Sequence, residues 1–231
     1  MHISRRAFLD AAIGLGTLRS LEAGPAVQQP TAEHTHRELV QGNARFASGY
    51  PRHPHSSLAR VRSTSRSGQH PHAVVLCCSD SRVAPEILFD QGIGDLFIIR
   101  VAGNVVNEDE LASIEYAVEH LHVPLCVVLG HSGCGAVTAV VEGDALPVEI
   151  SHLVVHIREA HEQMKQKFPN LAHRDLIEST VRANVERAVE GLRTGPLADH
   201  VARGTLRVEG GVYELKTGRV SWINPEQRAS R

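Results

Sequence analysis

The sequence predicts an α/β fold with a mostly parallel central sheet, flanking helices and an edge hairpin near the end of the chain. Short apolar runs rich in β-branched residues, such as 73–77 and 125–129, alternate with segments whose apolar residues recur at helical spacing. Apolar runs of this length are typical of strands buried on both faces of a sheet. Their alternation with helices favours parallel strands connected by helical crossovers.

The first half of the chain is expected to contain a helix, an arm and two strands. Apolar periodicity predicts the helix over 31–48. Residues 50–72 are rich in Pro, Arg, Ser and His, which predicts an extended or irregular arm, either disordered or wrapped around a partner subunit. After the strand at 73–77, Pro85 begins a short helical turn, and a second strand at 95–100 ends at Ala102-Gly103-Asn104.

The second half is expected to begin with a helix that Asn107 or Asp109 caps and that Pro124 ends, before the strand at 125–129. Apolar stripes at helical spacing predict the helices that follow. The remaining elements are expected in this order: a helix over 135–142, helices over 150–168 and 171–193, and a strand and hairpin over 205–223 at the sheet edge.

Length and composition limit the classes of function. The chain has 231 residues, 42% of them hydrophobic, and a formal net charge of -2, which suffices for one domain with a full core after a leader. This near-neutral balance offers no basic stripe, so no nucleic-acid partner is expected. Of the four cysteines, Cys77 and Cys126 lie inside apolar runs and are expected to be packed thiols.

Residues 1–26 have the pattern of a twin-arginine export signal. Arg5 and Arg6 precede a short run of small apolar residues at 11–18. That run is far too short to cross a bilayer, so no stable membrane span is expected. The pattern predicts a periplasmic or otherwise exported protein. The alternative is an amphipathic helix that stays on a cytoplasmic protein.

Two polar clusters follow the strands at 73–77 and 125–129. Cys78-Ser79-Asp80-Ser81-Arg82 follows the first strand, and His131-Ser132-Gly133-Cys134 follows the second. Parallel strands open their carboxyl ends on one edge of a sheet, so these side chains are expected to converge there. Each residue alone is more often a packed core residue, but the combination is typical of a metal site.

Sulfur, imidazole nitrogen and carboxylate oxygen are the ligands that zinc prefers, and three protein ligands with one exchangeable position are the catalytic arrangement. Cys78, His131 and Cys134 supply the three ligands. Asp80 is either a fourth ligand or a group beside the metal. The amino terminus of the helix at 135–142 would favour a thiolate at Cys134.

Three strings carry a resemblance to a known family: Cys-Ser-Asp-Ser-Arg at 78–82, Arg-Val-Ala-Gly-Asn at 100–104 and Gly-His-Ser-Gly-Cys-Gly at 130–135. In order and spacing they resemble the β-class carbonic anhydrases, and the similarity runs from about Thr31 to Ile223. The resemblance implies a β-carbonic anhydrase-like catalytic domain over 31–225. It also implies reversible hydration of carbon dioxide to bicarbonate and a proton, with one Zn²⁺ per chain.

The same resemblance assigns roles to individual residues. It makes Cys78, His131 and Cys134 the zinc ligands. It makes Asp80 and Arg82 a catalytic dyad, in which Asp80 accepts a hydrogen bond from the attacking hydroxide and Arg82 keeps that carboxylate ionised and away from the metal. The residues that match substrate contacts are Gln69, Phe97, Gly103 and Tyr116. Because family members build this pocket across a dimer interface, the chain is expected to form a dimer or tetramer.

Alternatives remain at this point. One is a carbonyl sulfide or carbon disulfide hydrolase on the same scaffold. Another is a non-catalytic zinc or thiol protein in which Cys77 and Cys78 act together, although adjacent residues of a strand point to opposite faces. Val75 occupies the position where bicarbonate-inhibited relatives carry Trp, so that form of inhibition is not expected.

Overall fold

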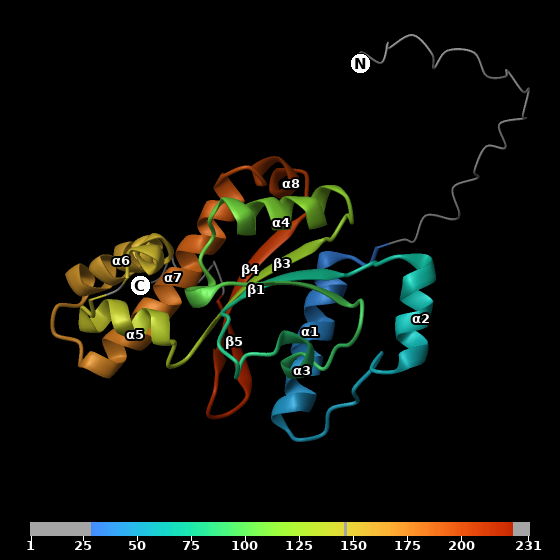
Figure 1. The fold of residues 1–231 in the computed structure, drawn as a ribbon, viewed down its shortest axis with the longest axis horizontal. Coiled ribbons are helices and arrows are strands. Elements are labelled where there is room, and N and C mark those ends of the chain that lie inside the picture. The colour runs from blue at the N-terminus through green and yellow to red at the C-terminus, as the bar shows by residue number, and fades with distance from the viewer. Residues whose placement is uncertain (1–28, 146, 224–231) are drawn as a thin grey trace, which may run out of the picture.

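The computed structural model describes residues 29–145 and 147–223, and the expected export signal at 1–26 lies outside them. Its centre is a five-stranded sheet with the strand order β2-β1-β3-β4-β5 (Figure 1). The strands are β1 (Ala73–Cys77), β2 (Leu96–Arg100), β3 (Leu125–His131), β4 (Arg207–Glu214) and β5 (Arg219–Ile223). The first four are parallel, and β5 returns antiparallel to β4 at one edge, so the predicted sheet and edge hairpin are confirmed.

Helices surround this sheet on both faces (Figure 1). They are α1 (Ala32–Ala47), α2 (Leu58–Ser67), α3 (Pro85–Leu88), α4 (Glu108–Glu119), α5 (Gly135–Glu142), α6 (Val148–Lys167), α7 (His173–Thr194) and α8 (Ala198–Ala202), with a 3₁₀ turn at Ala102–Asn104. The predicted helix starts at 31 and 135 are confirmed: Thr31 caps α1, and α5 begins at Gly135. Asn107 caps α4 through a capping box with Glu110.

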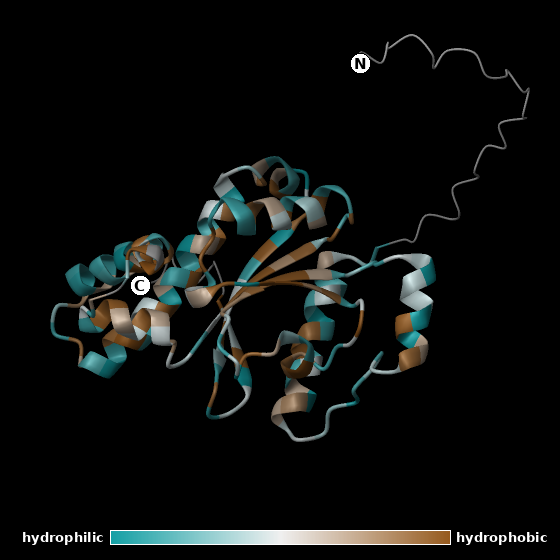
Figure 2. Cartoon of the chain, viewed as in Figure 1, coloured by the Kyte–Doolittle hydropathy of each residue, from teal (hydrophilic) through white to brown (hydrophobic). Residues whose placement is uncertain are grey.

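The core lies on both faces of the sheet. Val74 and Leu76 of β1 pack in one cluster with residues of α4 and α7, whereas Val75 and Cys77 pack in another with residues of α1 and α3. All five residues of β1 are buried, which explains its unbroken apolar sequence. Figure 2 shows the same arrangement, with brown strands in the centre and teal on the outward sides of the helices.

The prediction of an irregular arm over 50–72 is wrong for its middle part, which forms α2. Ser57 caps this helix by accepting a hydrogen bond from the Arg60 N–H, and none of its residues is buried. Without a buried face, α2 has no apolar stripe that would predict a helix. Two carboxylates hold the segment before and within α2: Asp90 accepts from the Arg52 N–H, and Asp95 accepts from Arg60.

The end of the chain also differs from the expectation. The strand and hairpin expected over 205–223 consist of only two strands, β4 and β5, and α8 was not expected. β4 runs through Gly210 and Gly211, although glycine weakens a strand. In the structure, a Cβ at Gly210 would lie 2.8 Å from Val185, so glycine there allows α7 to approach the sheet closely. Among residues 29–145 and 147–223, no helix combines the length and apolar character needed to cross a bilayer.

One buried amide ties α1 to the rest of the fold. The Asn43 side chain donates to the carbonyl oxygens of Leu88 and Gly218, at 3.1 Å and 2.9 Å, and accepts from the Val220 N–H at 2.8 Å. Because these partners are backbone groups far along the chain, Asn43 stabilises tertiary structure and not α1 alone. Removing such a buried side chain costs on the order of 1–3 kcal/mol in the free energy of unfolding.

Candidate metal centre

Three side chains converge where β1 and β3 end. Cys78 directly follows β1, His131 is the last residue of β3, and Cys134 is the residue at the amino terminus of α5. Their ligand atoms all lie within 4.8 Å of one another, and the two sulfurs are 4.0 Å apart. Two sulfurs bound tetrahedrally to one zinc ion at about 2.3 Å would be separated by roughly 3.8 Å. The three residues are buried, and the sequence-based expectation that they converge is confirmed.

The imidazole of His131 is oriented for metal binding. Its Nδ1 lies 3.1 Å from the Ser132 carbonyl oxygen. Because a carbonyl only accepts, Nδ1 carries the proton, and Nε2 presents its lone pair. Nε2 is buried and has no hydrogen-bond partner within the described part of the chain. A buried nitrogen of this kind is costly unless something binds it, and a ring nitrogen of His131 lies within 4.8 Å of both sulfurs. The donor set therefore fits a zinc ion.

The two thiols beside His131 are in hydrogen-bond contact, so each affects the ionisation of the other. The Cys134 S–H is the main cause that lowers the pKa of Cys78, and the N–H of Gly103, 3.3 Å from Cys78 Sγ, contributes to the same effect. The pKa of Cys134 is raised in turn, first because its thiol hydrogen-bonds to Cys78, then because it is buried, and also because its ionisation would place two thiolates side by side. Amides of Ala136 and Val137 oppose that rise, as expected for the amino terminus of a helix, but they do not overcome it.

The other two cysteines are packed in the core as predicted. Cys77 and Cys126 are fully buried, and burial raises the pKa of each thiol to about 12. Cys77 belongs to the core cluster on the α1 face of the sheet, whereas Cys78 belongs to the cluster with α5 and α6. Adjacent cysteines that face opposite sides cannot act as one thiol pair, which disfavours the redox alternative.

Asp80 and Arg82 form a bidentate ion pair beside the candidate metal ligands Cys78, His131 and Cys134. Arg82 Nε donates to Asp80 Oδ1 at 2.9 Å, and Nη2 donates to Oδ2 at 2.7 Å. This guanidinium holds the pKa of the Asp80 carboxyl far below its usual range. Asp80 Oδ2 is 3.8 Å from His131 Nε2. Asp80 was expected to be either a fourth ligand or a group beside the metal. The geometry favours the second alternative, because Arg82 already binds both carboxylate oxygens.

Backbone contacts shape the loop that carries Cys78 and Asp80. Arg100, at the end of β2, donates from Nη2 to the Asp80 carbonyl oxygen at 2.7 Å and from Nε to the Cys78 carbonyl oxygen at 3.3 Å. No role of its own is predicted for Arg100 from the sequence, although it begins the 100–104 string. Because it joins two strand ends, its role appears only when β1 and β2 are paired.

Carboxylates hold the loop between His131 and Cys134. Ser132 Oγ donates to Glu214 at 2.9 Å and accepts from the Leu215 N–H at 3.0 Å. The Gly133 N–H donates to Glu178 of α7 at 3.2 Å. Nothing in the sequence near Glu178 or Glu214 predicts these contacts, because both residues are far along the chain from the loop they hold.

Comparison with known proteins agrees with this geometry. A protein-family model described as carbonic anhydrase matches residues 73–220, which is more than half of the chain. The chain belongs to the β-carbonic anhydrase family. It is 40% identical over 186 residues to carbonic anhydrase 2 of Mycobacterium tuberculosis, which covers 79% of this chain and 88% of that protein. It is 41% identical over 188 residues to a carbonic anhydrase of Mycolicibacterium smegmatis, and the match covers 80% of this chain and 89% of that protein.

Solved structures show the same relationship. The β-carbonic anhydrase CcaA matches with a TM-score of 0.69 and 31% identity, covering 84% of this chain and 97% of that one. A Coccomyxa β-carbonic anhydrase solved in complex with acetazolamide matches with a TM-score of 0.64 and 30% identity, covering 80% of this chain and 84% of that one. Carbonic anhydrases are lyases that hydrate carbon dioxide reversibly, and this chain is an enzyme of that family.

Three residues that resemble substrate contacts of the family lie away from the metal-binding side chains of their own chain. Gln69 is exposed in the segment before β1, at the opposite end of that strand from Cys78. Phe97 pairs with Val74, four residues before Cys78, which corresponds to about 13 Å along the strand. Tyr116 of α4 is 46% exposed and its ring centre is 6.2 Å from that of Phe97.

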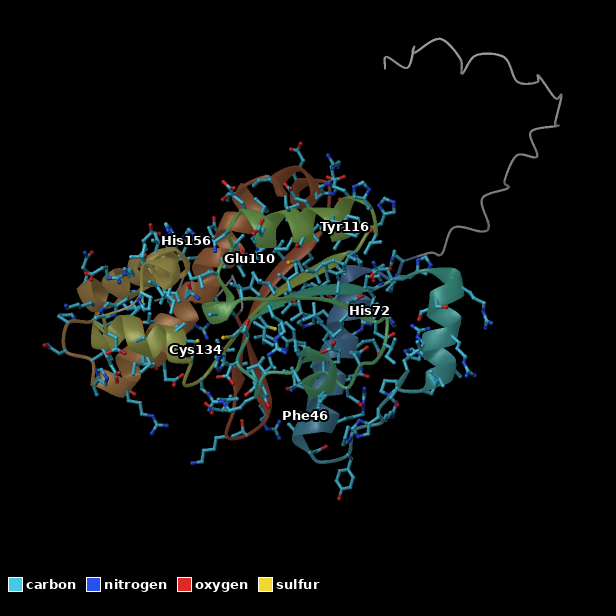
Figure 3. All side chains as sticks on the ribbon, viewed as in Figure 1. Phe46, His72, Glu110, Tyr116, Cys134 and His156 are labelled. Atoms are coloured by element: carbon cyan, nitrogen blue, oxygen red, sulfur yellow. The ribbon has the colours of Figure 1, made fainter. Side chains whose placement is uncertain are left out.

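Figure 3 shows the labelled Tyr116 and Cys134 well apart. One chain therefore does not bring Gln69, Phe97 and Tyr116 to the metal-binding side chains. Their role in substrate binding stays a prediction that depends on a second copy. Gly103 is different, because its N–H lies against Cys78 itself.

Proposed function

We propose that this carbonic anhydrase holds one Zn²⁺ per chain through Cys78, His131 and Cys134, and that its activity depends on that ion. The observation that carries the proposal is the buried Nε2 of His131, which has no hydrogen-bond partner among the described residues, on a ring that lies beside two sulfurs 4.0 Å apart. When bound at such a site, zinc acidifies water and supplies hydroxide near neutral pH. The net reaction adds water to carbon dioxide and releases bicarbonate and a proton.

Asp80 and Arg82 orient the reactants in this proposal. Asp80 stays ionised because Arg82 binds both of its oxygens, and it is therefore able to accept a hydrogen bond from the attacking oxygen atom. That hydrogen bond would direct an oxygen lone pair toward the carbon of carbon dioxide. Arg82 also prevents Asp80 from becoming a ligand, which would occupy the position that the reaction needs.

We further propose that the substrate pocket is completed by a second copy of the chain, in a dimer or tetramer. The separation of Phe97 and Tyr116 from the metal-binding side chains of the same chain supports this arrangement. Phe97, Tyr116 and Gln69 would then meet carbon dioxide from the neighbouring subunit, and Gly103 from the same subunit. A chain that stays monomeric at full activity would contradict this part of the proposal.

Metal removal tests the proposed zinc dependence. Dialysis of the purified protein against a chelator is expected to remove one zinc ion per chain and to abolish hydration, and added Zn²⁺ is expected to restore it. Zinc content is measured by atomic emission, and hydration by stopped-flow pH change. Because two thiolates donate more charge to zinc than imidazoles do, the rate is expected to rise toward mildly alkaline pH. A metal-free protein with the full hydration rate would overturn the proposal.

Parallel assays separate the alternative substrates. Carbonyl sulfide and carbon disulfide are offered to the same zinc-loaded protein, and released sulfide is measured. We expect carbon dioxide to be turned over and the two sulfur analogues to be turned over far more slowly. The opposite ranking would favour the hydrolase alternative while leaving the metal-binding residues unchanged.

We also propose that the enzyme is exported by the twin-arginine route, on the basis of Arg5 and Arg6 followed by a short apolar run. Replacing both residues by lysine keeps the charge and removes the paired arginines. In a bacterial host with this export system, the double variant is expected to accumulate in the cytoplasm while the unchanged chain reaches the periplasm. Immunoblots of the two fractions measure the difference, and equal export of both chains would contradict the proposal.

A further inference from the structure

The turn that follows β2 has an unusual backbone. Gly103 and Asn104 both have positive φ angles, 75° and 46°. For a residue other than glycine, this conformation costs on the order of 1 kcal/mol and persists only where the surroundings fix it. Space is also short, because a Cβ at Gly103 would lie 2.6 Å from Ile157 of α6. The turn is therefore fixed by its neighbours and not by its own sequence alone.

The strained turn presents one amide to the metal-binding side chains. The Gly103 N–H donates to Cys78 Sγ at 3.3 Å. The next peptide is held at both ends: the Asn104 N–H donates to the Val101 carbonyl oxygen at 3.1 Å, and the Gly103 carbonyl oxygen accepts from Asn184 Nδ2 at 2.8 Å. Gly103 therefore connects Asn184 to Cys78: its carbonyl oxygen binds the Asn184 side chain, and its N–H binds the Cys78 sulfur.

Asn184 is polar in a place where an apolar side chain would pack. It is 2% exposed on α7, between the core residues Ala183 and Val185 of the same helix. Burying an amide is costly unless it forms hydrogen bonds, and the contact of Asn184 Nδ2 with Gly103 is such a bond. One side of Asn184 lines a cavity of about 280 Å³ with Val105 and Leu111. A larger apolar side chain therefore has room at this position.

We propose that Asn184 is a positioning residue of the metal centre, which fixes the Gly103 peptide so that its N–H points at the Cys78 sulfur. This inference rests on the proposed zinc function. A hydrogen bond to a thiolate withdraws charge from the sulfur and orients it, and outer-shell contacts of this kind commonly change metal affinity by about 10- to 100-fold. Asn184 of α7 would thereby tune Cys78, the ligand that directly follows β1, without binding the ion itself.

The test compares Asn184→Ala with the matched substitution Asn43→Ala. Both remove a buried asparagine that donates to backbone carbonyls, but the partners of Asn43 are Leu88, Gly218 and Val220, none of which contacts the metal-binding side chains. We expect Asn184→Ala to raise the zinc dissociation constant about 10-fold, measured by competition with a chromophoric chelator. Asn43→Ala is expected to lower the melting temperature and leave that constant unchanged.

A spectroscopic measurement distinguishes positioning from general loss of stability. In the Co²⁺-substituted protein, the thiolate-to-metal absorption band reports the charge on sulfur. Loss of the Gly103 contact leaves more charge on Cys78, so Asn184→Ala is expected to move this band to longer wavelength. The Asn43→Ala band is expected to coincide with that of the wild-type protein. Asn184→Leu fills the adjacent cavity, excludes a replacing water molecule and is expected to show the same shift if Asn184→Ala does not fold.

Two results would overturn the inference. One is an unchanged zinc affinity and an unchanged Co²⁺ band in both Asn184 variants. The other is an equal change in Asn43→Ala, which would show that any loss of a buried amide has this effect. These failures are separate from that of the proposed function. If the wild-type protein bound no zinc, the function itself would fail, whereas zinc bound equally by wild type and Asn184→Leu would contradict only the role of Asn184.

Discussion

Cys134→Ser is expected to lose stoichiometric zinc and, with it, carbon dioxide hydration. A serine hydroxyl does not ionise near neutral pH, so the variant retains only Cys78 and His131 as strong ligands for a four-coordinate ion. The loss of activity is expected to exceed the roughly 100-fold that removal of an outer-shell contact costs. Zinc content per chain and the initial hydration rate are measured on the same preparation, and its circular dichroism spectrum shows whether the variant is folded, which distinguishes loss of a ligand from a folding defect.

The matched control for this variant is Cys126→Ser. It makes the same chemical change at a thiol that is fully buried in the core, away from Cys78, His131 and Cys134. A hydroxyl in that apolar position is expected to lower the melting temperature, because its burial would cost free energy that no hydrogen bond offsets. Zinc content and turnover are expected to stay at the wild-type level. A fully active, zinc-loaded Cys134→Ser protein would disprove the ligand assignment.

Arg82→Ala is expected to keep its zinc and lose turnover. The side chain of Arg82 is 58% exposed and contacts the Asp80 carboxylate and not the sulfurs, so its removal leaves the three ligands in place. Without it, Asp80 is free to approach the metal, and the carboxylate would occupy the reactive position. We expect kcat to fall about 10- to 100-fold, as for other outer-shell partners, with zinc content near one per chain.

Two further variants refine the Arg82 result. Arg82→Lys restores the positive charge but not the pair of parallel N–H donors, so its kcat is expected to lie between those of wild type and Arg82→Ala. Arg37→Ala removes an exposed arginine that pairs with Glu33 on α1, and it is expected to have no effect on turnover. If Arg82→Ala hydrated carbon dioxide at the wild-type rate, Asp80 would need no partner and the dyad assignment would be refuted.

The fold was predictable where a local pattern was sufficient. The apolar run at 73–77 is β1 residue for residue, and Thr31 and Asn107 cap helices as their chemistry requires. The helix that Pro124 was expected to end already ends at Glu119. Prediction failed where a tertiary contact decides the outcome. α2 lacks a buried face and is tied down by distant carboxylates, and Gly210 stays in a strand because α7 packs against it.

The candidate site divides in the same way. Cys78, His131 and Cys134 were predictable because each follows or begins an element at a fixed place in the chain, and parallel strands bring such places together. Arg100, Glu178 and Asn184 were not, because each acts on a peptide group, and the sequence does not show which peptide group lies opposite a given side chain. The spacing of residues along the chain predicts the candidate ligands, whereas the residues that hold the surrounding backbone are determined by tertiary packing.

The position of the proposed zinc ligands relative to the sheet has a consequence for how a bound ion would be lost. Cys78 directly follows β1, and His131 is the last residue of β3. Both strands have hydrogen-bonded neighbours on both sides, whereas β2 and β5 are the outer strands. Fraying and other low-energy openings start at outer strands and chain ends, so they leave these two anchors in place. If zinc binds as proposed, its release is therefore expected to require opening of the middle of the sheet, where the slowest amide exchange is also expected.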